Sequence, residues 1–152
     1  MPMPKTIPAP KVGSPFAAMT GDHVAVRVPN FDEAIAWYVG KLDFRVVHTW
    51  PYGDLKLAYV TPPADDGFRI EILAGEGARA KETWTDLGDS LNYAGWHHLC
   101  LRVENVDDTV AELRRRGVTI VAEPFELADI SRRLAFFCDP WGNLFELAQR
   151  LD

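Results

Sequence analysis

Short apolar segments alternate with polar turns along the first half of the chain, and their periodicity predicts strands and one helix. A period of two among β-branched residues predicts a strand at 24–28. Pro29 and Asn30 end that strand, and a helical pattern capped by Asn30 runs from there to residue 42. Three strand-like runs follow the helix, separated by turns rich in proline, glycine and aspartate. These runs are 44–50, 55–61 and 68–74.

The second half of the chain repeats this order of elements. Residues 98–111, HLCLRVENVDDTVA, align without a gap on 23–36, HVAVRVPNFDEAIA, at an offset of 75 residues. The repeat predicts another first strand, then a helix that Asn105 caps and Gly117 ends. Three more strand-like runs follow, at 118–122, 133–138 and 143–149. We therefore expect an α+β fold of two tandem βαβββ units.

These patterns also predict the organisation of the chain. The first eighteen residues contain five prolines and no apolar block of export-signal length, so we expect an extended arm at 1–20. A single domain at 21–152 should follow the arm. Its two units are expected at 21–74 and 96–150, and the linker at 75–95, where periodicity is weak, is expected to hold a short helix and a lid.

Side-chain alternation places four potential metal ligands on one kind of face. Successive side chains of a strand point to opposite faces of the sheet. The first strand of each unit carries a histidine, His23 or His98, opposite its apolar side chains, and the last strand does the same with Glu71 or Glu146. The apolar faces would pack under the helices. The His and Glu faces would then line the concave side of a curved, cup-like mixed sheet with the helices outside.

Two imidazoles and two carboxylates that converge predict a site for one divalent metal ion. Carboxylates grouped in a cleft repel one another and lose hydration, so they need a compensating cation. Two nitrogen and two oxygen donors suit zinc, nickel, iron, cobalt or manganese, and they leave positions for water or substrate. The short chain and its arm suggest a homodimer. The site could lie within one chain or be shared between two.

Other side chains near the predicted cup are candidates for substrate binding. Arg27 and Arg102 lie on the histidine faces and could bind an anionic substrate, with a role as rim charges as the alternative. Trp50 and Tyr59 could line an apolar pocket, although aromatic side chains on such strands more often build the core. His97 should point away from the cup, so we expect it to pack in the interior or to contact a ligand from behind.

Charge and composition exclude several other functions. The chain has 16 basic and 22 acidic residues, a formal charge of -6, and no basic run that could follow a phosphate backbone. Its apolar runs are far shorter than the roughly 20 residues that cross a bilayer. We therefore expect a cytoplasmic protein that binds a small molecule, not nucleic acid or membrane. Cys100 and Cys138 match no redox or zinc motif, and both are expected to be small buried apolar residues.

The chain resembles the vicinal oxygen chelate superfamily, which includes glyoxalase I, methylmalonyl-CoA epimerase, extradiol dioxygenases and the fosfomycin- and bleomycin-resistance proteins. The resemblance covers roughly 21–150 and is carried by three stretches. They are HVAVRVPNFDEAIAWYVGKLDFRVV, GWHHLCLRVENVDDTVAELRRRGV and DPWGNLFEL. The resemblance implies paired βαβββ units with a metal in the cup. It also implies that His23, Glu71, His98 and Glu146 are the four metal ligands.

The complete ligand set favours one branch of that superfamily. A carboxylate at Glu71 is similar to glyoxalase I, which implies a lyase or isomerase acting on vicinal oxygens through an enediolate. In that branch Glu146 would move the proton, with Glu71 as its counterpart. An extradiol dioxygenase using iron(II) is the alternative, because it needs only His23, His98 and Glu146. A non-catalytic small-molecule or antibiotic-binding protein is the other, because it needs the pocket but no intact metal set.

Overall fold

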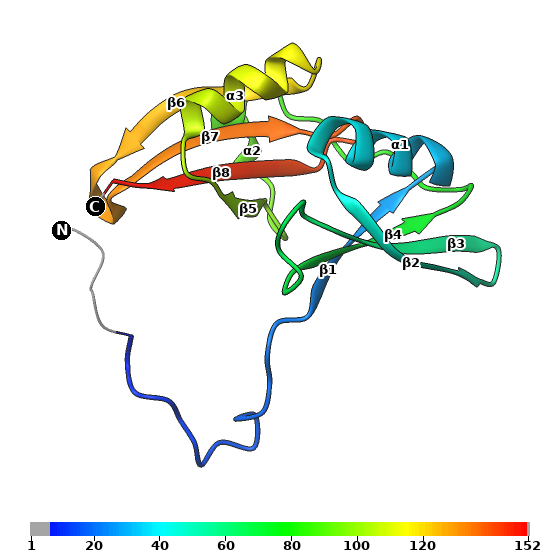
Figure 1. Cartoon of the computed structure of the whole chain (residues 1–152), viewed down its shortest axis with the longest axis horizontal. Helices are drawn as coiled ribbons and strands as arrows, with labels where there is room; N and C mark the ends of the chain where they lie inside the picture. Colours follow the sequence, from blue (N-terminus) through cyan, green and yellow to red (C-terminus); the bar gives the residue numbers. More distant parts are fainter. Residues whose placement is uncertain (1–6, 152) are drawn as a thin grey trace.

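The first predicted unit folds into a four-stranded mixed sheet with one helix against it (Figure 1). This computed structural model describes residues 7–151, so residues 1–6 of the predicted arm and the terminal Asp152 lie outside the described residues. The elements of the unit are β1 (His23–Val28), α1 (Phe31–Leu42), β2 (Arg45–Tyr52), β3 (Leu55–Thr61) and β4 (Arg69–Ala74).

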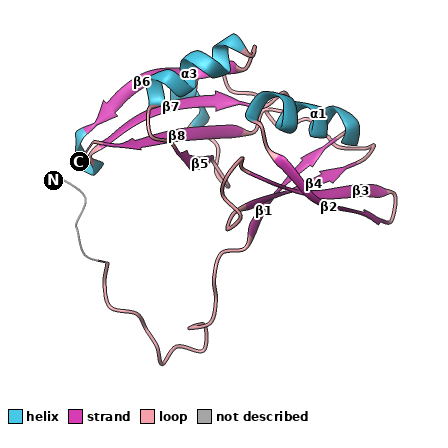
Figure 2. Cartoon of the chain, in the orientation of Figure 1, coloured by secondary structure: helices cyan, strands magenta, loops and turns pink. Residues whose placement is uncertain are grey.

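The second unit repeats the first and confirms the prediction of two βαβββ units (Figure 2). It consists of β5 (Leu99–Arg102), α3 (Val106–Arg115), β6 (Thr119–Leu127), η1 (Ala128–Ile130), β7 (Arg132–Cys138) and β8 (Leu144–Arg150). Between the units, the linker contains the expected short helix, α2 (Leu87–Ser90).

Both sheets have the same topology, in which the first strand lies beside the last. The orders are β1-β4-β3-β2 and β5-β8-β7-β6. In each sheet the first strand runs parallel to the last, whereas the other neighbours are antiparallel. β1 and β5 therefore form the edges of their sheets. The described strands make two separate sheets and not one continuous cup, because β1 and β5 do not pair with each other.

The helices begin where the sequence predicts. The Asn30 side chain accepts a hydrogen bond from the backbone N–H of Glu33 at 3.0 Å, and Asn105 does the same for Asp108 at 3.0 Å. Each bond satisfies one N–H that the first helical turn leaves without a partner. Gly117 follows α3 with a φ of 76°, a left-handed conformation that glycine adopts without steric cost.

The apolar faces of both sheets share one core with the helices. Fully buried side chains at its centre include Val28, Tyr38, Val60, Ile70, Ile72, Val106, Phe137 and Phe145. Since these residues come from both units, the two sheets are held in a fixed relation to each other. Among the described residues, no helix has the length and apolar character needed to cross a membrane.

One buried hydrogen bond joins the units across this core. The Tyr38 hydroxyl on α1 donates to the Asp139 carboxylate at 2.9 Å, and both residues are buried. Asp139 also accepts from the backbone N–H groups of Trp141 and Asn143 at 3.0 and 2.8 Å and from the Asn143 side chain at 2.7 Å. Asp139 therefore holds the turn that leads into β8 and ties that turn to the other unit.

The described part of the arm extends away from both sheets (Figure 1). Residues 11–19 form successive turns, in which the Ser14, Ala17 and Met19 backbone N–H groups bond to carbonyls three residues before them. The apolar side chains of the arm stay in solvent: Phe16 is 68% and Met19 is 73% exposed. Apolar side chains presented in this way favour contact with another molecule.

Candidate metal centre

The first half-site is the pair His23 and Glu71. His23 begins β1, and Glu71 lies on the neighbouring parallel strand β4, opposite Ala25. The two side chains therefore point to the same face, and His23 Nε2 lies 3.4 Å from Glu71 Oε2. Glu71 is more enclosed than His23, with side-chain exposures of 16% and 32%.

The second half-site is the pair His98 and Glu146, which repeats this geometry. His98 immediately precedes β5, and Glu146 lies on the parallel strand β8, opposite Cys100. His98 Nε2 lies 3.1 Å from Glu146 Oε2, and the exposures of the two side chains are 33% and 14%. The duplication seen in the sequence is thus reproduced atom for atom at both pairs.

A further side chain contacts the Nδ1 atom of each histidine. The Asp22 carboxylate lies 2.7 Å from His23 Nδ1, and His97 Nδ1 lies 2.8 Å from His98 Nδ1. The hydrogen bond from His23 lowers the pKa of Asp22, so Asp22 is an ionised acceptor and His23 donates its Nδ1 proton. These contacts leave Nε2 of each histidine facing a carboxylate oxygen.

This donor set fits a cation. A neutral His23 that gives its Nδ1 proton to Asp22 carries a lone pair at Nε2, and that lone pair faces the lone pairs of Glu71 at 3.4 Å. Two acceptors that face each other repel and lose hydration, and a positive charge between them, either a proton or a metal ion, offsets this cost. Imidazole nitrogen and carboxylate oxygen are also ligands that divalent transition metals accept.

The four predicted ligands do not converge within one chain. Among residues 7–151, no group of three or more His, Cys, Asp or Glu side chains is arranged to hold a metal ion. A single chain therefore presents two half-sites, one on each sheet, and the prediction of four converging donors is not met within one chain.

The two candidate arginines differ in what they contact. The Arg27 guanidinium donates to the backbone carbonyls of Leu73 at 3.0 Å and Glu76 at 2.9 Å, and also to that of Val28. It therefore ties β1 to the end of β4. Within the described residues the Arg102 side chain makes no hydrogen bond or ion pair, and it lines a hollow of about 320 Å³ together with Arg150.

The candidate aromatic residues lie beside the first half-site and not in the core. Tyr59 pairs with Glu71 across β3 and β4, and its ring centroid is 5.3 Å from that of His23. Trp50 packs against Tyr59 at 4.7 Å, and His48 stacks on Trp50 at 5.5 Å. Tyr59 and Trp50 remain partly exposed. This aromatic row, Tyr59–Trp50–His48, extends from the half-site across the sheet.

Cys100 corrects a prediction from the sequence. The expectation that both cysteines are buried is wrong, because Cys100 is exposed and Cys138 is partly exposed. Cys100 and Glu146 are register partners and lie on the same face of the sheet. Atoms packed around the thiol, and then the nearby Glu146 charge, raise the pKa of Cys100 to about 12, so it stays a neutral thiol near pH 7.

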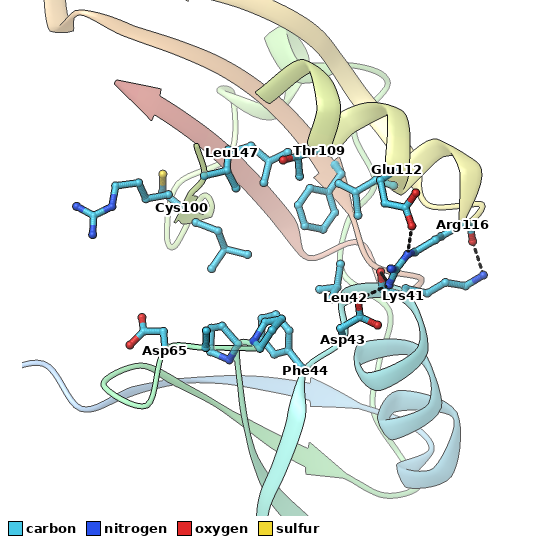
Figure 3. A pocket seen from close by; sticks show the side chains of 18 of the residues that line it. Lys41, Leu42, Asp43, Phe44, Asp65, Cys100, Thr109, Glu112, Arg116 and Leu147 are labelled. Atoms are coloured by element: carbon cyan, nitrogen blue, oxygen red, sulfur yellow. Dashed lines mark hydrogen bonds and ion pairs between the residues drawn. The ribbon is translucent and has the colours of Figure 1, made fainter. Parts of the chain in front are cut away.

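A wide hollow lies between the two units. It has a volume of about 1020 Å³ and separates α1 and the loop after β3 from β5 and α3 (Figure 3). Its lining residues include Phe44, Leu147 and Cys100, with Asp43 and Glu112 at one end. None of the four predicted metal ligands lines this hollow.

The sequence predicted the four candidate ligands but not Asp22, which contacts His23, or Ser90, which contacts His97. Asp22 stands next to His23, so its adjacency was the available signal. Ser90, which contacts His97 at 2.9 Å, lies in the linker, where no periodic pattern marked it. His97 occupies the position expected for a residue that contacts a ligand from behind.

Comparison with known proteins agrees with the fold. The model of a family described as the Glyoxalase/Bleomycin resistance protein/Dioxygenase superfamily matches residues 20–147. A probable lactoylglutathione lyase from Synechocystis sp. is 27% identical over 129 residues, covering 84% of this chain and 92% of the relative. The mitochondrial methylmalonyl-CoA epimerase of Homo sapiens is 24% identical over 163 residues, covering 95% of this chain and 86% of the relative. A glyoxalase family protein from Enterococcus faecalis has a TM-score of 0.70 at 21% identity, with 86% and 97% of the two chains covered.

Proposed function

Because this chain belongs to the Glyoxalase/Bleomycin resistance protein/Dioxygenase superfamily, we propose that it is a divalent-metal-dependent lyase or isomerase of the glyoxalase type. One observation carries the proposal: the same His–Glu pair occurs twice, and in each the imidazole Nε2 faces a carboxylate at 3.1–3.4 Å. The metal ligands would be His23, Glu71, His98 and Glu146. Zinc, nickel, iron, cobalt and manganese all suit this set.

The complete site would be shared across a homodimer. The first half-site of one protomer would meet the second half-site of its partner, and two-fold symmetry would build two identical sites. Three observations support this arrangement: the half-sites are separate in one chain, β1 and β5 are sheet edges, and the arm presents apolar side chains to solvent. Unpaired edge strands readily pair with another chain.

The chemistry of such a site is proton transfer next to a carbonyl. A divalent ion held by the four ligands would supply Lewis-acid stabilisation of the negative charge that develops on a substrate with vicinal oxygens. Glu146 would take the proton from the carbon next to the carbonyl and return it to the neighbouring carbon, so the substrate is isomerised without an external oxidant or reductant. Glu71 would be the counterpart of Glu146 on the opposite side.

The surroundings suggest how a substrate would be held. Arg102 is the better candidate for an anionic group, because its guanidinium is unpaired among the described residues, whereas Arg27 is occupied by backbone carbonyls. Trp50 and Tyr59 would contact an apolar or planar part of the substrate. We expect a small molecule that combines vicinal oxygens, a negative charge and an apolar part.

The aromatic row favours a second candidate function. Aromatic rings in contact at 4.7 and 5.5 Å beside His23 suit a planar aromatic substrate, and His23, His98 and Glu146 would supply two His and one Glu for iron(II). A ring-cleaving dioxygenase is therefore the alternative. Metal analysis comes first, followed by two assays: turnover of the methylglyoxal–thiol adduct with nickel or zinc, and oxygen uptake with catechol and iron(II). Activity in the oxygen assay alone would refute the lyase proposal, and a metal-free protein that binds an aromatic ligand would refute both.

Mixed dimers test whether the site is shared. Co-expression of His23→Ala with His98→Ala chains should produce heterodimers in which one site keeps all four ligands and the other loses both histidines. Random pairing makes half of the dimers mixed, so about one quarter of the wild-type sites should return. The matched control combines His23→Ala with Glu71→Ala, which damage the same half-site and should restore nothing. Equal metal content in both mixtures would refute a shared site.

A further inference from the structure

A chain of hydrogen bonds runs from His98 into the interior of the second unit. His98 Nδ1 lies 2.8 Å from His97 Nδ1, and His97 Nε2 lies 2.9 Å from Ser90 Oγ. Ser90 Oγ in turn lies 2.5 Å from the carbonyl oxygen of Leu87. Ser90 belongs to α2 and is only 3% exposed, so solvent does not compete for its hydroxyl group.

The far end of this chain sets its direction. A carbonyl oxygen can only accept, so the single proton of the Ser90 hydroxyl goes to Leu87 in the short 2.5 Å contact. Ser90 Oγ must then accept from His97, which places the proton of a neutral His97 on Nε2. The Nδ1 of that histidine is left as an acceptor, and it accepts the Nδ1 proton of His98.

We propose that Ser90 and His97 are positioning residues that hold neutral His98 in the Nδ1–H tautomer and so present its Nε2 lone pair to the metal ion. The inference rests on the proposed metal site. It gives the linker a role, because α2 supplies the buried serine at the end of the chain. It also distinguishes the half-sites: His23 is oriented by the exposed carboxylate of Asp22, whereas His98 is oriented by the His97 imidazole, which the buried Ser90 holds in turn.

The opposite direction is chemically possible and gives a different result. Ser90 would donate to His97, His97 would donate from Nδ1 to His98, and His98 would donate from Nε2 to Glu146. That direction would deprive the Leu87 carbonyl of its hydroxyl donor and place a proton on the atom that should bind the ion. The position of one proton on His98 therefore separates the two cases.

Long-range ¹H–¹⁵N NMR spectra of the full-length, metal-free protein measure this position at a pH where the imidazoles are neutral. The chain has four histidines, so assignment is direct. We expect His98 with a protonated Nδ1 and an unprotonated Nε2. His97→Phe, which has no acceptor, should give a mixture of tautomers, whereas His97→Asn keeps an acceptor near Nδ1 and should restore the wild-type pattern. Asp22→Asn is the matched control and should leave the His98 signals unchanged.

Zinc competition against a chelator gives a second measurement. Loss of the outer hydrogen bond in His97→Phe or Ser90→Ala should weaken zinc binding by about 10–100-fold, the usual effect of removing a group that orients a histidine ligand. His97→Asn should recover most of that loss. Nε2–H His98 in the wild-type protein, or an unaltered tautomer in His97→Phe, would overturn the inference even if zinc binds. The predicted tautomer in a protein that binds no metal would instead refute the proposed function.

Discussion

Replacement of Tyr38 by phenylalanine should destabilise the fold by about 2 kcal/mol, because it removes one hydrogen bond to a buried carboxylate and no carbon atom. Tyr38 is fully buried and Asp139 is 3% exposed, so water cannot replace the lost donor. Asp139 keeps its three other donors, from Trp141 and Asn143, which limits the loss to one bond. For a chain of this size the change corresponds to a decrease in Tm of roughly 4–8 °C.

Urea unfolding followed by circular dichroism measures this difference, with Tyr52→Phe as the matched control. Tyr52 loses the same hydroxyl group but is 71% exposed, so its substitution should change the free energy of unfolding by less than about 0.5 kcal/mol. Equal effects of the two substitutions would refute the reasoning, because the buried bond would then contribute nothing beyond that of a solvated hydroxyl.

The same hydroxyl predicts a dependence of stability on alkaline pH. Burial, and then the Asp139 charge, raise the pKa of Tyr38 well above its ordinary value of 10.0. Above pH 10 the unfolded chain loses this proton while the folded chain keeps it, so deprotonation stabilises the unfolded state. The contribution of Tyr38 is therefore complete below pH 10 and declines as the pH rises through the folded-state pKa. Tyr38→Phe should remove this part of the alkaline decline, and an unchanged pH profile would contradict the assignment.

The remaining predictions concern the site itself. His98→Ala should abolish stoichiometric metal binding measured by elemental analysis, whereas His48→Ala, in the aromatic row but outside the half-sites, should retain the ion; equal loss in both would contradict the ligand assignment. Arg102→Ala should raise KM for an anionic substrate at least several-fold with an unchanged melting temperature. Arg27→Ala should lower the melting temperature, because three backbone carbonyls each lose one donor. Cys100 should react slowly with iodoacetamide at pH 8 despite its exposure, because its pKa of about 12 keeps it protonated, and denaturation should restore ordinary reactivity. Fast alkylation of the folded protein would contradict the raised pKa of Cys100.

Local pattern predicted most of the secondary structure, and one strand shows where it fell short. The sequence predicted a strand at 118–122, which ends before Pro124, whereas β6 continues to Leu127. A proline has no N–H for a sheet, so it normally ends a strand. β6 lies at the edge of its sheet, and its register shifts between Ala122 and Phe125, so Pro124 is accommodated there.

The sequence by itself determined the duplication and the two His–Glu pairs. Period-two alternation decides which side chains share a face, and the repeat at an offset of 75 residues marks the same pair twice. The caps at Asn30 and Asn105 were equally readable, because each depends on a residue only three positions away. The alternation and the caps depend on short-range geometry, whereas the closeness of each His to its Glu also needs β1 beside β4 and β5 beside β8.

The tertiary structure alone decided which side chains support the His–Glu pairs and how far apart the two pairs lie. Ser90 of α2 contacts His97 in the segment that leads into β5, and Asp139 meets Tyr38 across 101 positions of sequence. The separation of the two half-sites was also decided there, because it depends on how one sheet packs against the other through the shared core. Contacts between distant segments follow from packing and loop closure, and local periodicity carries no information about either.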